Sequence, residues 1–224
     1  MFTGIVAAVG RVRSIVPESA DPKAGVRLTV DAGGLDLSDV AVGDSIAIAG
    51  ACVTVVEKSA VAFCVDVSRE SLDRTVGLAA PGEVNLEKSL RLADSLGGHL
   101  VAGHVDGVGE VLKFEPAGES FLLVVRAPRE LGRFIAAKGS VTIDGVSLTV
   151  NTVADTRAGC DFDINLIPHT ISVTTLKHLA QGARVNLEID LIARYVERML
   201  SDSAPTGATA QARHTSAATF KNTA

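Results

Sequence analysis

Two short blocks of the sequence each place a nucleophile-capable side chain two residues before a threonine. In one block Cys52 precedes Thr54, and in the other Ser147 precedes Thr149; each pair follows a glycine. Residues two apart on a strand face the same side, so a thiol or hydroxyl would lie beside the threonine hydroxyl. Taken singly, threonine is an ordinary strand former and a free cysteine is most often a small core residue. Core packing alone would not require a pair of polar residues to occur at the same positions in both blocks. Their repetition therefore favours a chemical role for these side chains.

The two blocks belong to a longer internal repeat, which indicates a duplicated domain. Residues 4–12 match residues 103–111 at glycine and valine positions, and 45–55 matches 140–150. The sequence Val-Asn-Leu-Glu then stands at both 84–87 and 185–188. The spacing between blocks differs slightly between the copies, as loop insertions allow. We therefore predict an N-terminal domain over 1–97 and a C-terminal domain over 98–189.

Each copy is predicted to be a small antiparallel barrel. Short β-branched runs, such as 26–30, 45–48, 53–56 and 61–67, alternate with Gly, Asp and Pro. About six strands per copy fit a closed barrel, and closure removes exposed strand edges. A helical turn is expected around 69–75 and again around 169–174. The predicted fold class is all-β, with two tandem homologous six-stranded Greek-key β-barrels plus a C-terminal α-helix.

Residues 190–201 carry the apolar spacing of an amphipathic helix. The apolar positions are Leu191, Ile192, Tyr195, Val196, Met199 and Leu200. So short a helix is marginal alone in water, so this apolar stripe must pack on something. Two interpretations stay open, packing against the same helix of other subunits and docking onto its own barrel. Residues 202–224 are dominated by Ala, Ser and Thr and are predicted to be a disordered tail.

The composition argues against several classes of protein. The formal net charge is -5, tryptophan is absent and Tyr195 is the one tyrosine, so no nucleic-acid partner is expected. No apolar run could span a bilayer, and the N-terminus does not resemble a signal peptide, so we expect no membrane association and a cytoplasmic protein. Cys52, Cys64 and Cys160 have no metal-ligand spacing and are interpreted as free thiols.

Six motifs, in order, resemble the riboflavin synthase α-chain family, in which lumazine-binding domains are duplicated. They are Met-Phe-Thr-Gly-Ile-Val at 1–6, Gly-Ala-Cys-Val-Thr-Val at 50–55, Gly-Gly-His-Leu-Val-Ala-Gly-His-Val-Asp at 97–106, Ile-Asp-Gly-Val-Ser-Leu-Thr-Val at 143–150, Asn-Leu-Ile-Pro-His-Thr at 165–170 and Val-Asn-Leu-Glu-Ile-Asp at 185–190. The resemblance covers roughly residues 1–200.

The resemblance implies a dismutation, the last step of riboflavin biosynthesis. One 6,7-dimethyl-8-ribityllumazine donates a four-carbon unit to another, which yields riboflavin and 5-amino-6-(D-ribitylamino)uracil. No cofactor, neither a metal nor a redox group, is expected. The family resemblance also implies a homotrimer held partly by the C-terminal helices, with each active site between the N-terminal barrel of one subunit and the C-terminal barrel of its neighbour. An association with lumazine synthase stays open.

By resemblance, the expected catalytic residues are His104, Cys52, Ser147 and Asp190. The reaction needs a base to remove a proton from the 7-methyl group and a nucleophile or activated water at C7 of the second molecule. His104 suits proton transfer because a histidine titrates near neutrality, and substrate orientation is its alternative role. Cys52 is a candidate nucleophile or polar contact. Asp190 is a candidate helix N-cap, a site residue, or both.

Substrate contacts are expected in both copies by the same motif matching. In the first copy they are Gly4, Ile5, Val6, Cys52, Val53, Thr54, Asp66, Val67, Ser68, Arg69, Glu70 and Ser71. In the second copy they are Gly103, His104, Val105, Lys138, Ser147, Leu148, Thr149, Asn165, Leu166, Ile167, Pro168, His169 and Thr170. His104 matches Ile5 in the repeat and Asp144 matches Ala49, which indicates unequal roles for the two copies.

Two other functions compete with this one. A non-catalytic lumazine- or flavin-binding protein, serving as an antenna or store, would use the same barrels. Such a binder needs only one good site, whereas both copies here keep the Gly-x-Cys/Ser-x-Thr block. The flavin-binding barrel of a reductase would need an attached nicotinamide-binding α/β unit, and no Gly-rich phosphate loop follows in the sequence. The residues favour the enzyme.

Overall fold

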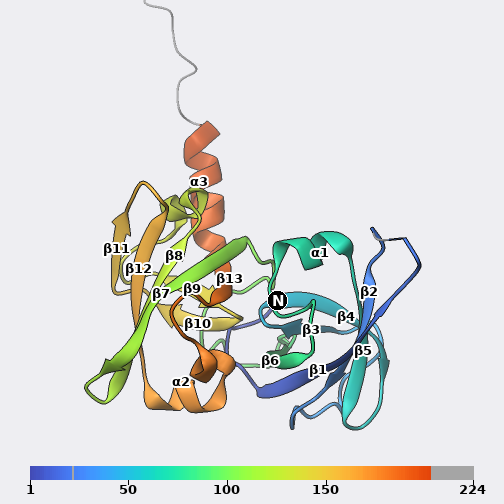
Figure 1. Ribbon diagram of the computed structural model, residues 1–224. Helices are drawn as coiled ribbons and strands as arrows, with labels where there is room; N and C mark the ends of the chain where they lie inside the picture. Colours follow the sequence, from blue (N-terminus) through green and yellow to red (C-terminus); the bar gives the residue numbers. More distant parts are fainter. Residues whose placement is uncertain (22, 203–224) are drawn as a thin grey trace, which may run out of the picture.

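The first half of the chain forms a closed barrel of six antiparallel strands (Figure 1). Along strands such as 26–31 and 62–67 the side chains alternate between the buried interior and the outer surface. The computed structural model describes residues 1–21 and 23–202. The strands are β1 (Ala8–Pro17), β2 (Val26–Asp31), β3 (Ser45–Ile48), β4 (Ala51–Lys58), β5 (Ala62–Val67) and β6 (Gly82–Lys88). Around the barrel their order is β1-β2-β5-β4-β3-β6. The helix α1 (Arg69–Arg74) follows β5 and confirms the predicted helical turn.

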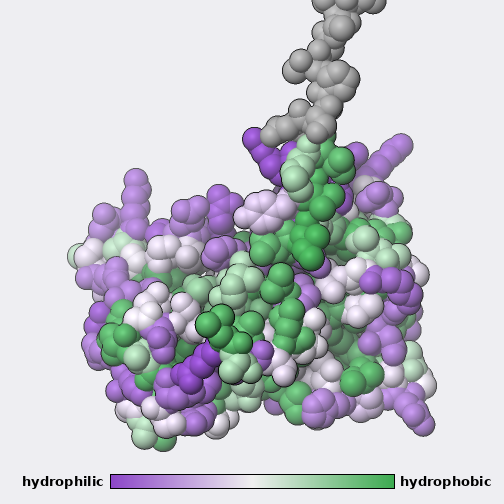
Figure 2. Space-filling model, turned by 180° about the vertical axis from the view of Figure 1, so that it is seen from behind, coloured by the Kyte–Doolittle hydropathy of each residue, from purple (hydrophilic) through white to green (hydrophobic). Residues whose placement is uncertain are grey.

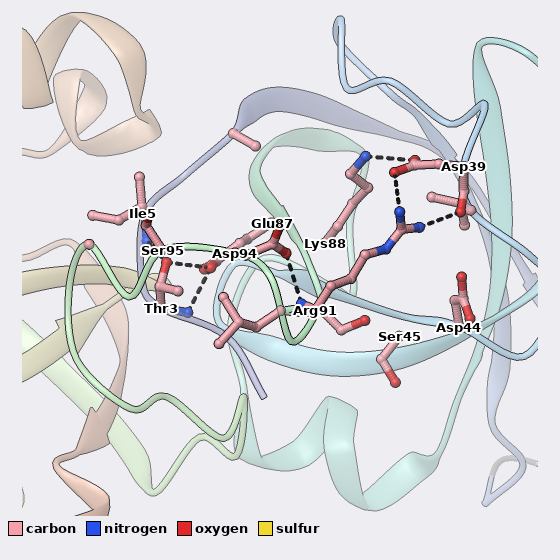
Figure 3. Close-up of a pocket in the computed structure, with 15 residues that line it drawn as sticks. Thr3, Ile5, Asp39, Asp44, Ser45, Glu87, Lys88, Arg91, Asp94 and Ser95 are labelled. Carbon is pink, nitrogen blue, oxygen red and sulfur yellow. Dashed lines mark hydrogen bonds and ion pairs between the residues drawn. The ribbon is translucent and has the colours of Figure 1, made fainter.

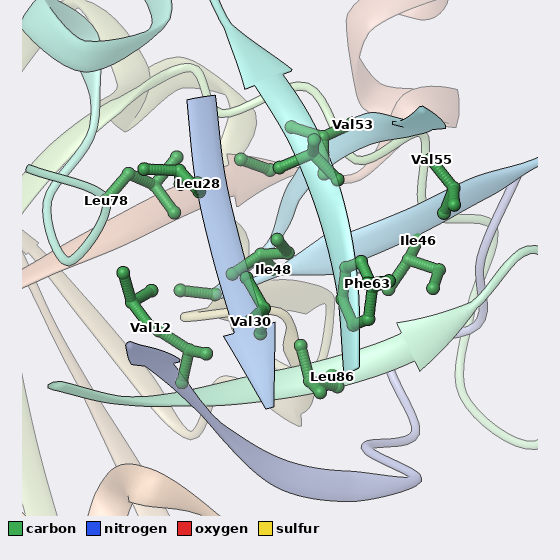
Figure 4. Close-up of a cluster of buried hydrophobic side chains, with 14 of the residues drawn as sticks. Val12, Leu28, Val30, Ile46, Ile48, Val53, Val55, Phe63, Leu78 and Leu86 are labelled. Atoms are coloured by element: carbon green, nitrogen blue, oxygen red, sulfur yellow. The ribbon is translucent and has the colours of Figure 1, made fainter. Parts of the chain in front are cut away.

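The inward-facing positions of these strands form the core of the first barrel. Figure 4 shows Phe63 beside Ile46, with Leu28, Ile48 and Leu86 around the same interior. All five side chains are almost wholly buried. Burial of one large apolar side chain contributes about 1.5–3 kcal/mol relative to exposure. These side chains therefore stabilise the closed arrangement of the six strands.

The second half repeats this arrangement with one strand interrupted. Its elements are β7 (Gly107–Ala117), β8 (Ser120–Ala127), a 3-10 helix η1 (Arg129–Phe134), β9 (Ser140–Ile143), β10 (Val146–Thr149), β11 (Thr152–Asp155), β12 (Cys160–Leu166), α2 (Pro168–Val173), a 3-10 helix η2 (Thr175–His178) and β13 (Arg184–Ile189). The order in this curled sheet is β10-β9-β13-β7-β8-β12-β11. The helix α2 confirms the second predicted helical turn.

The all-β class is confirmed, but the second sheet has seven strands rather than the six predicted because β10 and β11 together replace β4. The ladder of β4 already shifts register between Val55 and Glu57. At the matching place in the second half, the N–H of Val150 donates to Gly139 O at 3.0 Å, as that of Val55 donates to Asp44 O at 2.9 Å. These bonds extend the β3–β4 and β9–β10 pairings by one residue, and the irregularity lies on the opposite edge, where β4 shifts its register with β5 and the pairing with β12 begins only at Thr152.

The two halves meet through reciprocal contacts made by matched residues. The asparagines of the two Val-Asn-Leu-Glu motifs cross over, because Asn85 Nδ2 donates to Asp144 O and Asn186 Nδ2 donates to Ala49 O, each at 2.9 Å. The turns beside them touch at Gly50 and Gly145. A Cβ on either glycine would lie 2.8 Å from the backbone nitrogen of the other, and both have a positive φ, so only glycine fits. The matched contacts give the pair an approximate two-fold symmetry.

Asp144 at this junction should make the stability depend on pH. Burial raises its pKa from 3.8 to about 7, and its one side-chain hydrogen bond is from the N–H of Asn186, at 2.8 Å. The unfolded chain loses this proton near pH 4, whereas the folded chain keeps it to about pH 7, so folding is progressively disfavoured as the pH rises across that window. Above pH 7 the cost of the buried charge is complete.

We therefore expect Asp144→Asn to be more stable than the parent protein at pH 8, by roughly 1–3 kcal/mol, and of similar stability near pH 4. The asparagine keeps an acceptor for Asn186 and tolerates the φ of 48° at this position. Urea unfolding at several pH values measures the difference. An equal free energy of unfolding for both proteins at pH 8 would show that Asp144 carries no such cost.

The C-terminal helix α3 (Leu191–Asp202) projects from the second barrel with its apolar face uncovered (Figures 1 and 2). Asp190 is its N-cap, since Asp190 Oδ1 accepts from the N–H of Ile192 at 2.8 Å. Polar contacts attach the helix: Arg194 Nη2 donates to both oxygens of Asp106, at 2.7 and 2.8 Å. Several apolar residues of the stripe are 45–67% exposed, namely Ile192, Tyr195, Val196, Met199 and Leu200.

Docking of that stripe onto its own barrel, one of the two interpretations left open by the sequence, is therefore wrong. The disordered tail predicted over 202–224 lies, from residue 203 onward, outside the described residues. No helix in the described part of the chain is both long enough and apolar enough to cross a membrane.

Candidate functional site

The segment that precedes the first strand of each barrel lies on the other barrel. The carbonyl of Gly4 accepts from the N–H of Ser147 in β10, and the carbonyl of Gly103 accepts from the N–H of Cys52 in β4, both at 2.7 Å. The two segments also pair with each other, because Phe2 and Val101 exchange backbone hydrogen bonds at 2.7 and 3.1 Å. Each barrel therefore receives part of its surface from the other copy.

This exchange corrects the grouping made from the sequence. Val6, assigned to the first copy, packs against the core of the second barrel, whereas Val105 packs against that of the first. It follows that Gly4 to Val6 belong with Ser147, and Gly103 to Val105 belong with Cys52. Periodicity along a strand does not specify which barrel a terminal segment will join, and this is the reason for the error.

The first site is a cavity of about 240 Å³ between β4, α1 and the exchanged segment 103–105. Cys52 is half-buried in its wall and His104 is exposed at its edge. Gly103 has a φ of 78°, and a Cβ there would lie 2.7 Å from Cys52 Cβ, so a glycine permits this close approach. The lining residues are Ala51, Cys52, Val53, Glu70, Ser71, Arg74, Thr75, Gly103, His104 and Val105.

The remaining first-barrel candidates do not line this cavity, and three of them have side chains engaged in other contacts. Arg27 donates to both oxygens of Asp66, at 2.7 and 3.0 Å, and this arginine holds the pKa of the Asp66 carboxyl below its usual value. Ser68 caps α1 by accepting from the N–H of Ser71 at 3.1 Å. Arg69 forms an ion pair with Asp73. Of the other two, Thr54 is exposed on β4 and Val67 is buried in the barrel core.

The second site contains a histidine that the sequence analysis missed as a candidate. His99 Nδ1 lies 2.7 Å from Ser147 Oγ, and His99 Nε2 is buried with no hydrogen-bond partner within residues 1–21 and 23–202. Burial lowers the pKa of His99, although the charge of Asp190 acts in the opposite direction. The imidazole is therefore neutral at neutral pH, with one ring nitrogen protonated and the other able to accept a hydrogen bond.

Gly98 makes the contact between His99 and Ser147 possible. A Cβ on Gly98 would lie 2.1 Å from Thr3 O and 2.8 Å from Ser147 Cβ, so any other residue would push the segment off the serine. The sequence did contain a signal for this histidine, since Gly97, Gly98 and His99 open one of the six motifs. The sequence did not indicate that His99 pairs with Ser147, because the two residues are 48 positions apart.

Lys138 stands in the loop between η1 and β9, in an unfavourable backbone conformation. Its φ is 66°, where the matched Gly43 of the first copy has 98°. Its N–H donates to Val150 O at 2.7 Å and its Nζ donates to Asn151 Oδ1 at 3.3 Å. A lysine kept in the left-handed region costs free energy that a glycine would not, which points to a role for the ammonium group.

Of the other candidate site residues in the second copy, some lie on the surface and others are buried in the barrel core. Thr149 is exposed on β10 and Thr170 is half-buried on α2, at the position that matches Ser71. Leu148 and Leu166 are buried in the barrel core. The exposed residues at the junction of β12 and α2 are Asn165, Ile167, Pro168 and His169. We define the second site by Ser147, His99, Thr149, Thr170 and the exchanged segment 4–6.

A larger cavity, of about 630 Å³, lies on the first barrel (Figure 3). Its position on the first barrel corresponds to the start of α3 on the second. Its cationic groups are paired: Lys88 Nζ lies 2.7 Å and Arg91 Nη1 lies 3.0 Å from oxygens of Asp39. Thr3 and Ile5 form the side of it that adjoins the second site. Within the described residues, no three His, Cys, Asp or Glu side chains are grouped so that they could hold a metal ion.

Comparisons with known proteins agree with this duplicated architecture. The family described as "Lumazine binding domain" matches residues 3–89 and again 102–190, which defines the chain as a protein with two lumazine-binding domains. A riboflavin synthase of Photobacterium phosphoreum is 42% identical over 206 residues, covering 89% of each chain. One of Brucella abortus is 42% identical over 206 residues, covering 89% of this chain and 98% of that one. The chain belongs to the riboflavin synthase family.

Solved structures resemble the fold as well. The crystal structure of LumP complexed with riboflavin superposes with a TM-score of 0.72 at 25% identity, covering 84% of this chain and 99% of that chain. LumP complexed with flavin mononucleotide gives a TM-score of 0.68 at 26% identity, with the same coverage.

Proposed function

We propose that the chain catalyses the dismutation of two 6,7-dimethyl-8-ribityllumazine molecules into riboflavin and 5-amino-6-(D-ribitylamino)uracil. The observation that carries the proposal is a pair of related sites with different chemical groups, Cys52 with His104 in one and Ser147 with His99 in the other. A reaction between two identical molecules needs two similar binding surfaces that treat their ligands differently. The riboflavin synthases at 42% identity support the assignment.

In this proposal the second site supplies a preformed neutral base. His99 Nδ1 lies 2.7 Å from Ser147 Oγ, and in the tautomer with Nδ1 unprotonated it accepts from the hydroxyl, which makes the serine oxygen a better proton acceptor or nucleophile toward bound ligand. Lys138 and Thr149 supply a cation and a hydroxyl for the ring and the ribityl chain, and Asp190 combines its capping role with a charge near His99.

In the first site His104 transfers a proton at the edge of the cavity. Its exposed imidazole reaches the bound molecule from a segment whose backbone is fixed. Cys52 offers a thiol on the wall beside it, at the position where the second barrel has Ser147. The two sites thus differ in the group that carries the proton and in the group that meets C7.

The direct test is to add 6,7-dimethyl-8-ribityllumazine to the purified, chelator-treated chain and follow riboflavin absorbance and fluorescence. We expect riboflavin to form without added metal or nicotinamide. A preparation that binds the lumazine but produces no riboflavin over hours would contradict the proposal and favour the non-catalytic binding protein.

We further propose that the chain forms a homotrimer in the cytoplasm, with the first site of one subunit facing the second site of the next. The exposed apolar stripe of α3 supports this assembly, because an uncovered helical stripe of this size is normally buried against a partner. Cys52, Cys64 and Cys160 are all free thiols, the state that a reducing compartment maintains.

The double variant Ile192→Glu, Val196→Glu should therefore give monomers with little riboflavin synthase activity. The two side chains are 63% and 45% exposed, so the new charges leave the barrels intact but cannot be buried between helices. Light scattering and circular dichroism measure mass and folding. Deletion of 203–224 is the control and should leave the trimer unchanged; an unaltered trimer in the double variant would exclude α3 as the interface.

A further inference from the structure

The glutamates of the two Val-Asn-Leu-Glu motifs bind the backbone of the exchanged segments. Glu188, at 2% exposure, accepts from the N–H of Ala102 at 2.7 Å and from the N–H groups of Gly103 and His104 at 3.0 Å each. Its counterpart Glu87 accepts from the N–H and hydroxyl of Thr3 at 2.7 Å each (Figure 3). Glu87 also accepts from the N–H of Gly4 at 3.0 Å. These motifs have no part in the mechanism proposed above.

The contact of Glu188 links the two barrels at the first site. Glu188 stands on β13 of the second barrel, yet His104, whose amide it binds, lines the cavity of the first. The next carbonyl toward the N-terminus, that of Gly103, accepts from Cys52 N at 2.7 Å. One short segment is thus held from both sides, by a carboxylate of one barrel and a strand amide of the other.

Only a carboxylate satisfies this geometry. Three N–H donors converge on two oxygens, and an ionised carboxylate accepts at about four lone-pair positions. Glutamine would turn an NH2 group toward one or more of these donors and leave them unpaired. The segment 102–104 lies outside the strands, so it has no ladder hydrogen bonds to compensate.

We propose that Glu188 is a positioning residue that sets the place of the His104 imidazole at the first site. The inference rests on the proposed function for the role of His104, but not for the contact itself. The matched Glu87 does the same for the segment that enters the second site, so each site takes its position from a glutamate on the opposite barrel.

The surroundings of Glu188 define how the contact responds to pH. Burial raises the pKa of Glu188 to about 7, and the nearby Asp106 carboxylate adds to the increase. Asp106 is itself paired with Arg194 of α3. On β9 the residue opposite Glu188 is the uncharged Thr142, and on the exchanged segment the titratable group is His104. Protonation of Glu188 below pH 7 should therefore weaken the amide contacts.

The experiment compares Glu188→Gln with the matched variant Glu87→Gln and with Glu119→Gln, an exposed carboxylate in the β7–β8 turn. For Glu188→Gln we expect kcat for riboflavin formation to fall about 10–100-fold, with a smaller change in lumazine affinity, because the histidine is displaced and not removed. The amide signals of Gly103 and His104 should shift. Glu87→Gln should shift the amides of Thr3 and Gly4 instead, and Glu119→Gln should change neither set nor the turnover.

A titration of the unmodified protein gives a second measurement if Glu188→Gln does not fold. The amide shifts of Ala102, Gly103 and His104 should titrate together near pH 7. This readout needs no turnover, so it tests the contact even if no riboflavin forms. Amide shifts that stay constant from pH 5 to pH 9, or a folded Glu188→Gln with unchanged kcat, would overturn the proposal.

Discussion

Replacement of His104 by alanine should lower the rate of riboflavin formation by about 10²–10⁴-fold while changing lumazine affinity far less. A proton-transfer group acts mainly in the transition state, so its loss affects turnover more than binding. The substitution should not disturb the fold, because the side chain is exposed and the backbone of the segment is held by Glu188. Steady-state kinetics and ligand titration on the same preparation measure both quantities.

The control for this variant is His178→Ala. His178 is also exposed, and its Nε2 lies 2.8 Å from Glu83 on a surface outside both sites, so its removal should leave turnover unchanged. Cys52→Ser should be milder than His104→Ala, since Ser147 occupies the matching position in the other barrel and a hydroxyl still offers a hydrogen bond to the ligand. Full turnover in His104→Ala would show that the first site uses another group for the proton.

Disruption of the pair formed by His99 and Ser147 should have the second largest effect. Ser147→Ala and His99→Gln should each lower kcat about 10²-fold, and the double variant should be little worse than either, because groups that act as a unit are not additive. Glutamine fills much of the space of the imidazole but places no hydrogen-bonding atom at the position of Nδ1, which lies 2.7 Å from Ser147 Oγ. Single-turnover kinetics on the three variants measures the rates, and additive losses would contradict a functional pair.

A mixture of two impaired variants tests whether the sites work across subunits. His104→Ala alters the first site and Ser147→Ala alters the second, so some interfaces in co-refolded trimers combine two unaltered sites. We expect the mixture to exceed the activity of either variant alone. A mixture that does not exceed its components, despite verified subunit exchange, would show that the two sites do not act together between chains.

The secondary structure and its duplication were predictable from the sequence because they depend on local patterns. Strand alternation, turn residues and the Val-Asn-Leu-Glu repeat indicated two β-barrels, and both helical turns were found where expected, at α1 and α2. The apolar spacing from Leu191 predicted α3, and Asp190 was predicted as its cap. These features follow from side-chain periodicity and backbone preferences over a few residues.

Only the tertiary structure decided which residues share a site. The segments 4–6 and 103–105 exchange barrels, His99 meets Ser147 across 48 positions, and Glu188 binds the amide of His104 across 84. No local pattern encodes such pairings, because they depend on two surfaces that meet at the approximate two-fold axis. The division between β10 and β11 also depends on tertiary pairing, because β10 pairs with β9 whereas the pairing with β12 begins only at Thr152.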